Sequence, residues 1–482
     1  MKSSRAPLPW NAAVWLALAA AAGGAVACLW WAWCHFPQLA WNDARLAPAF
    51  ALRHGINPYP PEGGGPLSTW IYGPVGLLLN LPATFAATAA RALHAASLLN
   101  FGVVLAPLLV VFFGSAELRA RGLPLCSLAF ALGVLLVPAP NLVLQVADHA
   151  AIAFGLLSCW TLARPAAPRA RDLGLAALLC ALAIGSKQIA VFAAAGQGIF
   201  LLLAHGRRTA LAYAGGLAAC VLLGGTIMIA AFGRDALWLN LVAIPAKLPW
   251  ADIPARLAMR PLALLAQVVL PLLGLLLLWR TGRWPHRGSV SGRFFQLTAL
   301  VFGAMLPIGL AGYGKIGGDT NLLHSANYLM PAALLAWLVG GHQVVATARS
   351  LLVVTACALV LHWPRLTSLP VRPHTQHLAM AAQITAAFPQ AVWFPQNPVI
   401  TFYADGRLWH SEDGIVTRHL AGRGLRGPEF RPHLPPRLKA VAYPVFNKTH
   451  ATMSLLPEFS RTTELPYWTL LTAPDPVTPR RE

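Results

Sequence analysis

The stretch LGLAALLCALAIGSKQIAVFAAAGQGIFLLLA, residues 173–204, decides the fold class of this chain. As one continuous helix it would extend for about 48 Å, well beyond the ~30 Å of hydrocarbon in a bilayer. Broken at Gly185-Ser186-Lys187, it forms two short helices of about 21 Å each. We therefore predict a helical hairpin inside a membrane, with Lys187 recessed at the turn.

The composition extends this prediction to most of the chain. Soluble domains carry about 25% charged residues, whereas this chain has 11% charged and 57% hydrophobic residues. The apolar run from residue 12 is too long for the core of a signal peptide and is interpreted as an uncleaved first span. We predict eleven membrane-spanning helices, at about 12–33, 92–113, 123–140, 149–163, 173–186, 188–204, 210–232, 262–280, 294–312, 325–341 and 350–363.

The basic residues predict the orientation of these spans. With the N-terminus in the cytoplasm, the cytoplasmic loops are 1–11, 114–122, 164–172, 205–209, 280–293 and 341–349. They hold most of the Lys and Arg outside the C-terminal tail, as the positive-inside rule requires: Lys2, Arg5, Arg119, Arg121, Arg164, Arg169, Arg171, Arg207, Arg208, Arg280, Arg283, Arg287, Arg293 and Arg349. The formal charge of +20 therefore reflects membrane topology, and no nucleic-acid partner is expected.

Two regions depart from the pattern of spans. Residues 74–90 are apolar but short and contain Pro82, so we predict a membrane-embedded or interfacial helix that returns to the outer side. From Arg365 onward polar and proline-rich sequence replaces the spans, with a helix expected in HTQHLAMAAQITAAF and strands in AVWF, LKAVAYP and YWTLLT. The expected fold is an all-α polytopic membrane domain, residues 1–363, followed by a small soluble α/β domain, residues 364–482, outside the cytoplasm. Interfacial helices are expected in the first outer loop, residues 34–91.

The ionisable and polar residues near span ends, apart from the cytoplasmic arginines, fall on the outer side of this topology. They are Asp43, Arg45, Arg53, His54, Asn57, Tyr59, Glu62 and Tyr72 in the first outer loop, then Gln145, Asp148, His149, Lys187, Gln188, Lys315, Asp319, Asn321, His324, Asn327 and Tyr328. One shared outer cavity would explain this arrangement. Charged groups at membrane depth are costly and are usually functional.

Structural roles are the alternative for each of these residues. Asp43 could cap an interfacial helix, and Lys187 could extend its ammonium group to the membrane surface. Lys315 and Asp319 could form a solvated ion pair, and Tyr59 could belong to the aromatic belt at the membrane surface. Asp148-His149 could be an ordinary solvated turn, and Tyr72 could share the role of Tyr59.

Four motifs resemble one known superfamily. Asp43 followed by LRHGINPYPP (52–61) and STWIYGPVG (68–76) is similar to the first outer loop of GT-C polytopic glycosyltransferases. LQVADHAAIAFGLL (144–157), LAIGSKQIAV (182–191) and GGDTNLLHSANYLMPAALL (317–335) resemble three further outer motifs of the same enzymes. Relatives include protein O-mannosyltransferases, the lipid A aminoarabinose transferase and polyprenyl-phosphate-mannose-dependent enzymes.

The resemblance implies an inverting transferase in a bacterial inner membrane, which moves a sugar from a polyprenyl-phosphate donor to a lipid, glycan or protein acceptor on the outer face. It implies Asp43 as the general base. The donor phosphate would be bound by cationic partners, for which the candidates are Lys187, Lys315, Arg53 and His54. The candidates for substrate binding are Tyr59, Tyr72, Asp148, His149, Gln188, Asp319, Asn321 and His324.

Departures from the superfamily limit this inference. Tyr72-Gly73-Pro74 stands where the best-known branch has Lys-Pro-Pro or Tyr-Pro-Pro. Outer acidic residues are few, so a divalent metal is not favoured and no cofactor is expected. Two other classes remain open: a transporter or lipid flippase, which predicts polar residues throughout the membrane depth, and an assembly factor of the cell envelope.

Overall fold

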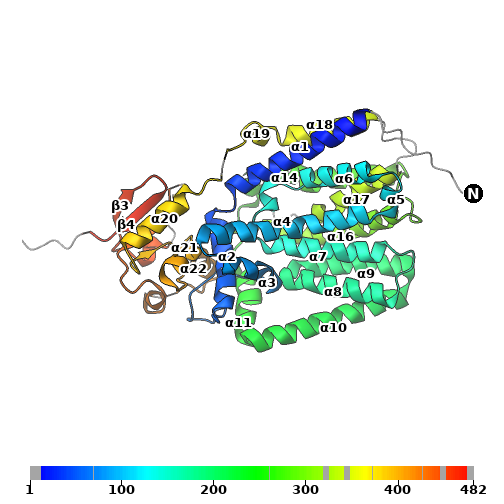
Figure 1. Cartoon of the computed structure of the whole chain (residues 1–482). Helices are drawn as coiled ribbons and strands as arrows, with labels where there is room; N and C mark the ends of the chain where they lie inside the picture. Colours follow the sequence, from blue (N-terminus) through cyan, green and yellow to red (C-terminus); the bar gives the residue numbers. More distant parts are fainter. Residues whose placement is uncertain are drawn as a thin grey trace, which may run out of the picture.

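The computed structural model describes residues 12–68, 70–259, 261–318, 325–340, 348–371, 373–425, 427–445 and 452–474. Most of these residues are helical, and a small sheet lies near the C-terminus. Figure 1 shows the long helices side by side in one bundle, with the N-terminus at one end and the sheet at the other.

The bundle consists of the stretches predicted as spans. Its helices are α1 (Ala12–His35), α4 (Ala89–Gly114), α6 (Leu123–Leu136), α7 (Ala147–Ala163), α8 (Ala170–Ser186), α9 (Val191–His205), α10 (Arg207–Phe232), α16 (Val290–Tyr313), α17 (Ser325–Gly340) and α18 (Ala348–Leu361), together with the consecutive segments α14 (Pro261–Leu264), η5 (Leu265–Val269) and α15 (Leu270–Arg280). Within the described residues, five helical stretches are long and apolar enough to cross a membrane, and further apolar helices are shorter. These apolar helices are consistent with a multi-pass membrane protein.

The predicted break in the stretch 173–204 is confirmed. Helix α8 ends at Ser186, and α9 begins at Val191 after the short turn η3 (Gln188–Ala190). Lys187 lies in this turn and is buried. The hairpin therefore has the two short arms that the hydrocarbon thickness predicts.

Three of the predicted cytoplasmic loops meet at the end of the bundle away from the sheet. The guanidinium of Arg293 donates to the backbone carbonyls of Ala163, at 2.9 Å, and Arg164, at 3.0 Å. The carboxylate of Glu117, in α5 (Ala116–Arg119), accepts the backbone N–H of Val290 at 2.7 Å. Loops that the charge pattern assigns to one side are thus in direct contact.

The first outer loop contains α2 (Ala40–Arg53), α3 (Val75–Asn80) and the 3₁₀ turn η1 (Leu81–Phe85). A single membrane-embedded or interfacial helix was predicted for residues 74–90, and this stretch contains the short segments α3 and η1 before α4 begins at Ala89. A new helix starts there because Thr88 caps it, its hydroxyl accepting the N–H of Arg91. Helix α2 differs from the expected interfacial helix, because its residues from Asn42 to Ala51 are all buried.

The C-terminal part is α/β, as predicted. Four strands, β1 (Val392–Trp393), β2 (Ala440–Pro444), β3 (Arg461–Glu464) and β4 (Trp468–Thr472), form a sheet in the order β1-β2-β4-β3. Strand β1 pairs parallel with β2, and the other pairs are antiparallel. Helix α20 (Gln376–Ala387) was expected, whereas β3, α21 (Pro398–Asp405) and α22 (Glu412–Leu420) were not.

The remaining short segments are α11 (Arg234–Trp238), η4 (Leu239–Ala243), α12 (Ile244–Lys247), α13 (Ile253–Met259), η2 (Ala139–Leu142), α19 (Trp363–Leu366), α23 (Gly427–Phe430), η7 (Arg431–His433) and η8 (Met453–Leu455).

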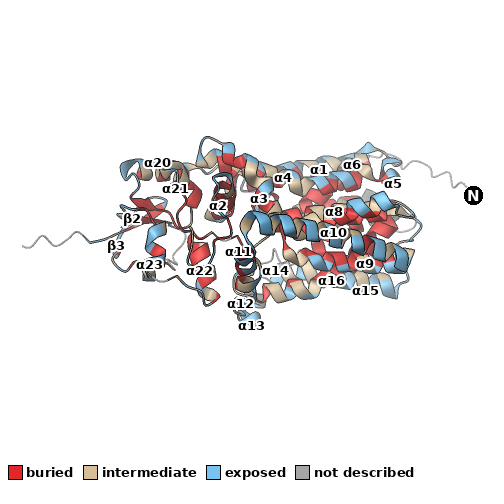
Figure 2. Cartoon of the chain, turned by 90° about the horizontal axis from the view of Figure 1, so that it is seen from below, coloured by how far each residue is buried: buried red, intermediate tan, exposed pale blue. Residues whose placement is uncertain are grey.

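Helix α2 belongs to the hydrophobic core of the C-terminal domain. Leu46 and Phe50 of α2 pack in one cluster with Leu378 of α20, Ile400 of α21 and Trp468 of β4. Figure 2 shows buried residues in α2 and in the neighbouring α21 and α22. A division of the chain at residue 363 therefore does not separate two independent cores. Helix α2 lies before that boundary but packs in the core of the C-terminal domain.

Candidate functional site

Two sequence motifs meet where the first outer loop contacts the end of α8. A Cβ atom on Gly73 would lie 2.0 Å from the carbonyl oxygen of Gly185, so only glycine permits this approach. The contact sets the loop residue Tyr72 beside Lys187, although the two residues are far apart in the sequence.

Lys187 and Asp148 form a buried ion pair at this junction. The ammonium Nζ of Lys187 donates to Oδ1 of Asp148, and the two side chains are 5% and 2% exposed. Asp148 lies in the first turn of α7, where the helix dipole favours a negative charge. The Nζ atom also lies 5.2 Å from the centre of the Tyr72 ring. The cation is therefore held between a carboxylate and an aromatic face.

Arg45 brings a second cation to the same tyrosine. Its Cζ atom lies 5.3 Å from the centre of the Tyr72 ring and 4.4 Å from that of Trp41. Its guanidinium also lies 3.8 Å from the carboxylate of Asp413, in α22. Arg45 was not among the predicted site residues. Its position two residues after Asp43, on a predicted interfacial helix, was the available signal.

Two predicted substrate-binding residues hold the loop in place. The hydroxyl of Tyr59 donates to the carbonyl of Tyr72 at 2.7 Å, and Tyr59 is fully buried, which raises its pKa above the ordinary value. The amide of Gln188 donates to the carbonyls of Ile71, at 3.0 Å, and Leu241, at 3.3 Å. In this arrangement both side chains position Tyr72.

His149 lies between the ion pair and an apolar cavity. Its Nδ1 atom is 3.1 Å from both Oδ1 of Asn100 and the carbonyl oxygen of Leu144. The imidazole lines a cavity of about 50 Å³ between α4, α6, α7 and α17, whose walls are mostly apolar. The charges of Asp148 and Lys187 both act on the His149 ring, so the ion pair lies near this wall of the cavity. Its other polar lining residues are Asn141 and Asn327.

Asp43 is completely buried where α2 meets the C-terminal domain. Its Oδ1 atom accepts the backbone N–H of Val399 at 2.7 Å, and its buried Oδ2 atom makes no hydrogen bond. Burial raises the pKa of Asp43 to about 8, against the opposing effect of hydrogen bonds from Val399, Asn397 and Ile400. Asp43 therefore caps a helix, as the structural alternative proposed, but that helix is α21 and not α2.

Three predicted phosphate-binding residues make their contacts outside the cluster of Arg45, Tyr72, Asp148 and Lys187. Arg53 donates to the carbonyl of Thr84 and lies over the ring of Phe85, and His54 contacts Phe402. Arg53 is the last residue of α2 and His54 follows it, about 12 Å or more along the helix from Arg45. Lys315 donates to the carbonyl of Pro245 at 3.0 Å and to that of Ala246 at 3.3 Å. Asp319, Asn321 and His324 lie outside the described residues.

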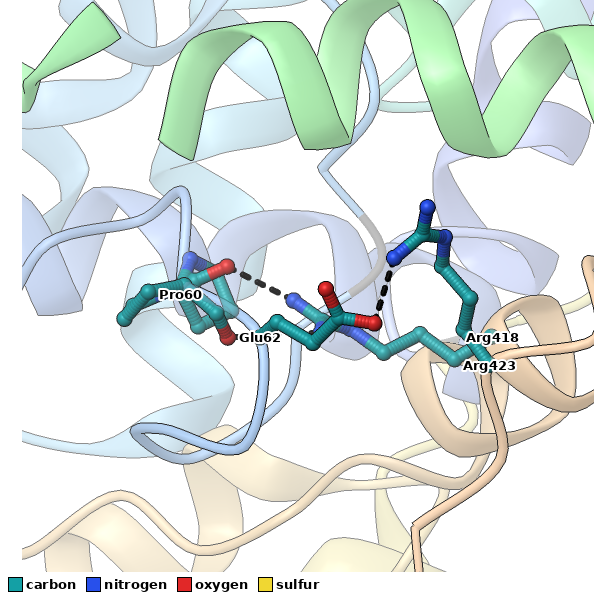
Figure 3. A network of polar contacts seen from close by, with 5 residues as sticks. Pro60, Glu62, Arg418 and Arg423 are labelled. Atoms are coloured by element: carbon teal, nitrogen blue, oxygen red, sulfur yellow. Dashed lines mark hydrogen bonds and ion pairs between the residues drawn. The ribbon is translucent and has the colours of Figure 1, made fainter. Parts of the chain in front are cut away.

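The C-terminal domain also binds the first outer loop through arginines that sequence reasoning did not single out. Arg418 donates to the carbonyl of Pro60 at 2.6 Å and to that of Pro61 at 3.3 Å. Arg423 forms an ion pair with Glu62 (Figure 3). Asn240, in η4, donates to the same carbonyl of Pro60 at 3.0 Å. The loop is thus held between the bundle and the C-terminal domain.

Metal ligands and known relatives add nothing to this geometry. In the part of the chain that the structure describes, no group of three or more His, Cys, Asp or Glu side chains is arranged to hold a metal. Comparison of the chain with protein-family models, characterised proteins and solved structures finds no match.

Proposed function

We propose that this chain is a membrane glycosyltransferase that moves a sugar from a polyprenyl-phosphate donor to an acceptor on the extracytoplasmic face. The observation that carries the proposal is the meeting of Tyr72, Asp148 and Lys187, from three separate motifs, at one end of an apolar bundle. The cluster adjoins an apolar cavity. A cation beside an apolar cavity suits a substrate that joins a phosphate to a long hydrocarbon chain.

The proposed reaction is a single displacement at the anomeric carbon. The acceptor oxygen bonds to that carbon while its proton passes to the carboxylate of Asp43. The bond from the carbon to the phosphate oxygen breaks, and the ammonium of Lys187 stabilises the negative charge that develops on the lipid phosphate. One displacement inverts the configuration. Asp43 acts as a base only when ionised, so α21 must first move away from it, because burial there raises its pKa to about 8.

We further propose eleven crossings, with the N-terminus in the cytoplasm and the C-terminal domain outside the bacterial inner membrane. The support is that Arg293 contacts the carbonyl of Arg164, and Glu117 the backbone N–H of Val290, at one end of the bundle, where the charge pattern expects the cytoplasm. Lys187 follows α8 at the end opposite to Arg169, and Figure 1 shows the sheet at the end of the bundle away from α5.

A second candidate function, a transporter or lipid flippase, has one observation in its favour. Within the bundle, the hydroxyls of Tyr213 and Ser158 both donate to Oε1 of Gln197, whose amide donates to Sγ of Cys159. This buried polar network lies toward the end of the bundle away from Lys187. A transport path would use polar groups at such depths.

An in vitro assay separates the two candidates. The purified chain is mixed with radiolabelled polyprenyl-phosphate sugars and a membrane extract as acceptor, and the variants Asp43→Asn and Lys187→Ala are measured beside it. We expect labelled acceptor with the wild type and strongly reduced labelling with both variants. Movement of labelled lipid across liposomes without any transfer would favour the flippase.

A further inference from the structure

Arg418 is a buried cation whose direct partners are neutral. The residue is 3% exposed, and its guanidinium donates hydrogen bonds to the carbonyls of Pro60 and Pro61. Burying a charge among neutral groups is costly, and a nearby anion offsets that cost. Burial lowers the pKa of Arg418 to about 10, the charge of Glu62 raises it and the charge of Arg423 lowers it. The Glu62 carboxylate is therefore the anion that stabilises Arg418.

Glu62 is shared between two arginines. Its carboxylate forms an ion pair with Arg423, and Figure 3 shows it between the guanidinium groups of Arg418 and Arg423. The backbone N–H of Arg423 donates to the carbonyl of Arg418 at 2.8 Å, so the turn after α22 keeps both arginines on one side. The guanidinium groups of Arg418 and Arg423 thus face the same carboxylate.

The carboxylate of Glu62 is able to leave this position. The Glu62 side chain is 66% exposed and that of Arg423 is 27% exposed, so solvent reaches the pair. Three glycines follow Glu62. Gly63 and Gly65 have positive φ values of 71° and 67°, a backbone conformation that most other residues do not adopt. A surface ion pair contributes little free energy, so displacing Glu62 costs little.

We propose that Arg418 and Arg423 form a binding site for a phosphate group, and that this group displaces Glu62. Arginine forks bind such planar or tetrahedral oxyanions through paired hydrogen bonds. The site belongs to the C-terminal domain, on the extramembrane side of Lys187. We assign the anion to the acceptor, either as a lipid headgroup or as a free phosphate. This assignment rests on the proposed function.

A binding titration tests this site without measuring transfer. The full-length chain in a neutral detergent is titrated, at constant ionic strength, with inorganic phosphate and with dihexanoyl phosphatidic acid, and thermal stability is the readout. We expect Glu62→Gln to bind the anion about two- to fivefold more tightly, because the competing carboxylate is gone. We expect Arg423→Gln to bind it at least about tenfold more weakly. Binding of both probes identifies a general phosphate site, and binding of phosphatidic acid alone identifies a headgroup site.

The chain offers a matched control pair on the same domain. Arg431 and Glu458 form an exposed ion pair at 2.7 Å, and the variants Arg431→Gln and Glu458→Gln should leave both titrations unchanged. Wild-type affinity in Glu62→Gln and in Arg423→Gln, or equal shifts in the control pair, would overturn the proposal. If the chain binds the anion as expected but transfers no sugar, the proposed function is wrong and the proposed binding site is retained.

Discussion

The backbone N–H of Val399 donates a 2.7 Å hydrogen bond to Oδ1 of Asp43, joining two helices that lie 356 residues apart in the sequence. The carboxyl of α2 thereby lies at the N-terminus of α21, where a helix has N–H groups without internal partners. This contact and the packing of Phe50 against Phe402 and Tyr403 fasten the first outer loop to the C-terminal domain. Asp43 thus has a structural role in addition to the catalytic role that we propose.

Replacing Asp43 with Asn separates its two roles. The asparagine oxygen still accepts the N–H of Val399, so we expect folding to be retained. Transfer should fall by about 10²- to 10⁴-fold, since an amide cannot accept the acceptor's proton. Asp43→Ala should in addition lower the free energy of unfolding by about 1 kcal/mol, the usual cost of a lost cap. Transfer assays and heat denaturation in detergent measure the two effects. Undiminished transfer by Asp43→Asn would exclude Asp43 as the base.

The raised pKa of Asp43 predicts a pH dependence of stability. The native carboxyl stays protonated up to about pH 8, whereas the unfolded one ionises near its ordinary value of 3.8. Between these values the unfolded chain binds fewer protons, so native stability falls as pH rises, by at most about 1.4 kcal/mol per unit. Above about pH 8 the dependence ends. The check is the difference in melting temperature between the wild type and Asp43→Asn at several pH values. A difference that stays constant from pH 5 to pH 8 would contradict the burial of this carboxyl.

The sequence predicted what local patterns determine. Apolar runs located the bundle helices, and the polar break at Gly185-Ser186-Lys187 separated α8 from α9. It did not reveal that α2 is buried, because Leu46 and Phe50 at helical spacing suit a membrane surface and a protein core equally well. Helix α22 was missed although Ser411 caps it, its hydroxyl accepting the N–H of Gly414. That local signal was short and had no long apolar pattern after it.

The site was predicted in part for the same reason. Asp148 and Lys187 lie next to predicted span ends and Tyr72 lies in the predicted first outer loop, so the predicted topology puts all three on one side. Arg53 was grouped with them because sidedness fixes a membrane face and not a position on it. Its hydrogen bond to the carbonyl of Thr84 depends on how η1 folds back onto α2, which no local pattern encodes.

The buried pair of Lys187 and Asp148 predicts a particular set of variants. Lys187→Met alone leaves an unpaired buried carboxylate and should lower stability by about 3–5 kcal/mol. The double variant Lys187→Met with Asp148→Leu removes both charges and should regain most of that stability. It should not regain transfer, because the proposed phosphate partner is gone. Heat denaturation and transfer assays on the single and double variants decide this. Recovery of transfer in the double variant would show that the pair is purely structural.

The apolar cavity next to His149 predicts a dependence on the length of the donor lipid. Ala153 lines the cavity, and Ala153→Leu adds three carbons to its space of about 50 Å³. We expect KM for a long-chain polyprenyl donor to rise at least about tenfold, since each displaced methylene is worth about 1 kcal/mol or more. KM for a short-chain analogue should not change. Leu178→Phe, at an exposed position of α8, is the control and should alter neither value. Equal effects of Ala153→Leu on both donors would mean that the lipid binds elsewhere.

The contact between Gly73 and Gly185 predicts a severe effect from one added methyl group. In Gly73→Ala the new Cβ would lie 2.0 Å from the carbonyl oxygen of Gly185, and backbone cannot turn aside as a flexible side chain can. The loop must therefore shift, at a cost of about 1–3 kcal/mol in stability, and carry Tyr72 away from Lys187. Gly174 lies in α8, the helix of Gly185, and a Cβ atom there would have no other atom within 4 Å. Gly174→Ala should therefore raise stability by up to about 1 kcal/mol. Melting temperatures and transfer rates of the two variants provide the comparison. If both alanine variants behave alike, the first outer loop does not rest on the end of α8, and the cluster around Lys187 loses the contact that assembles it.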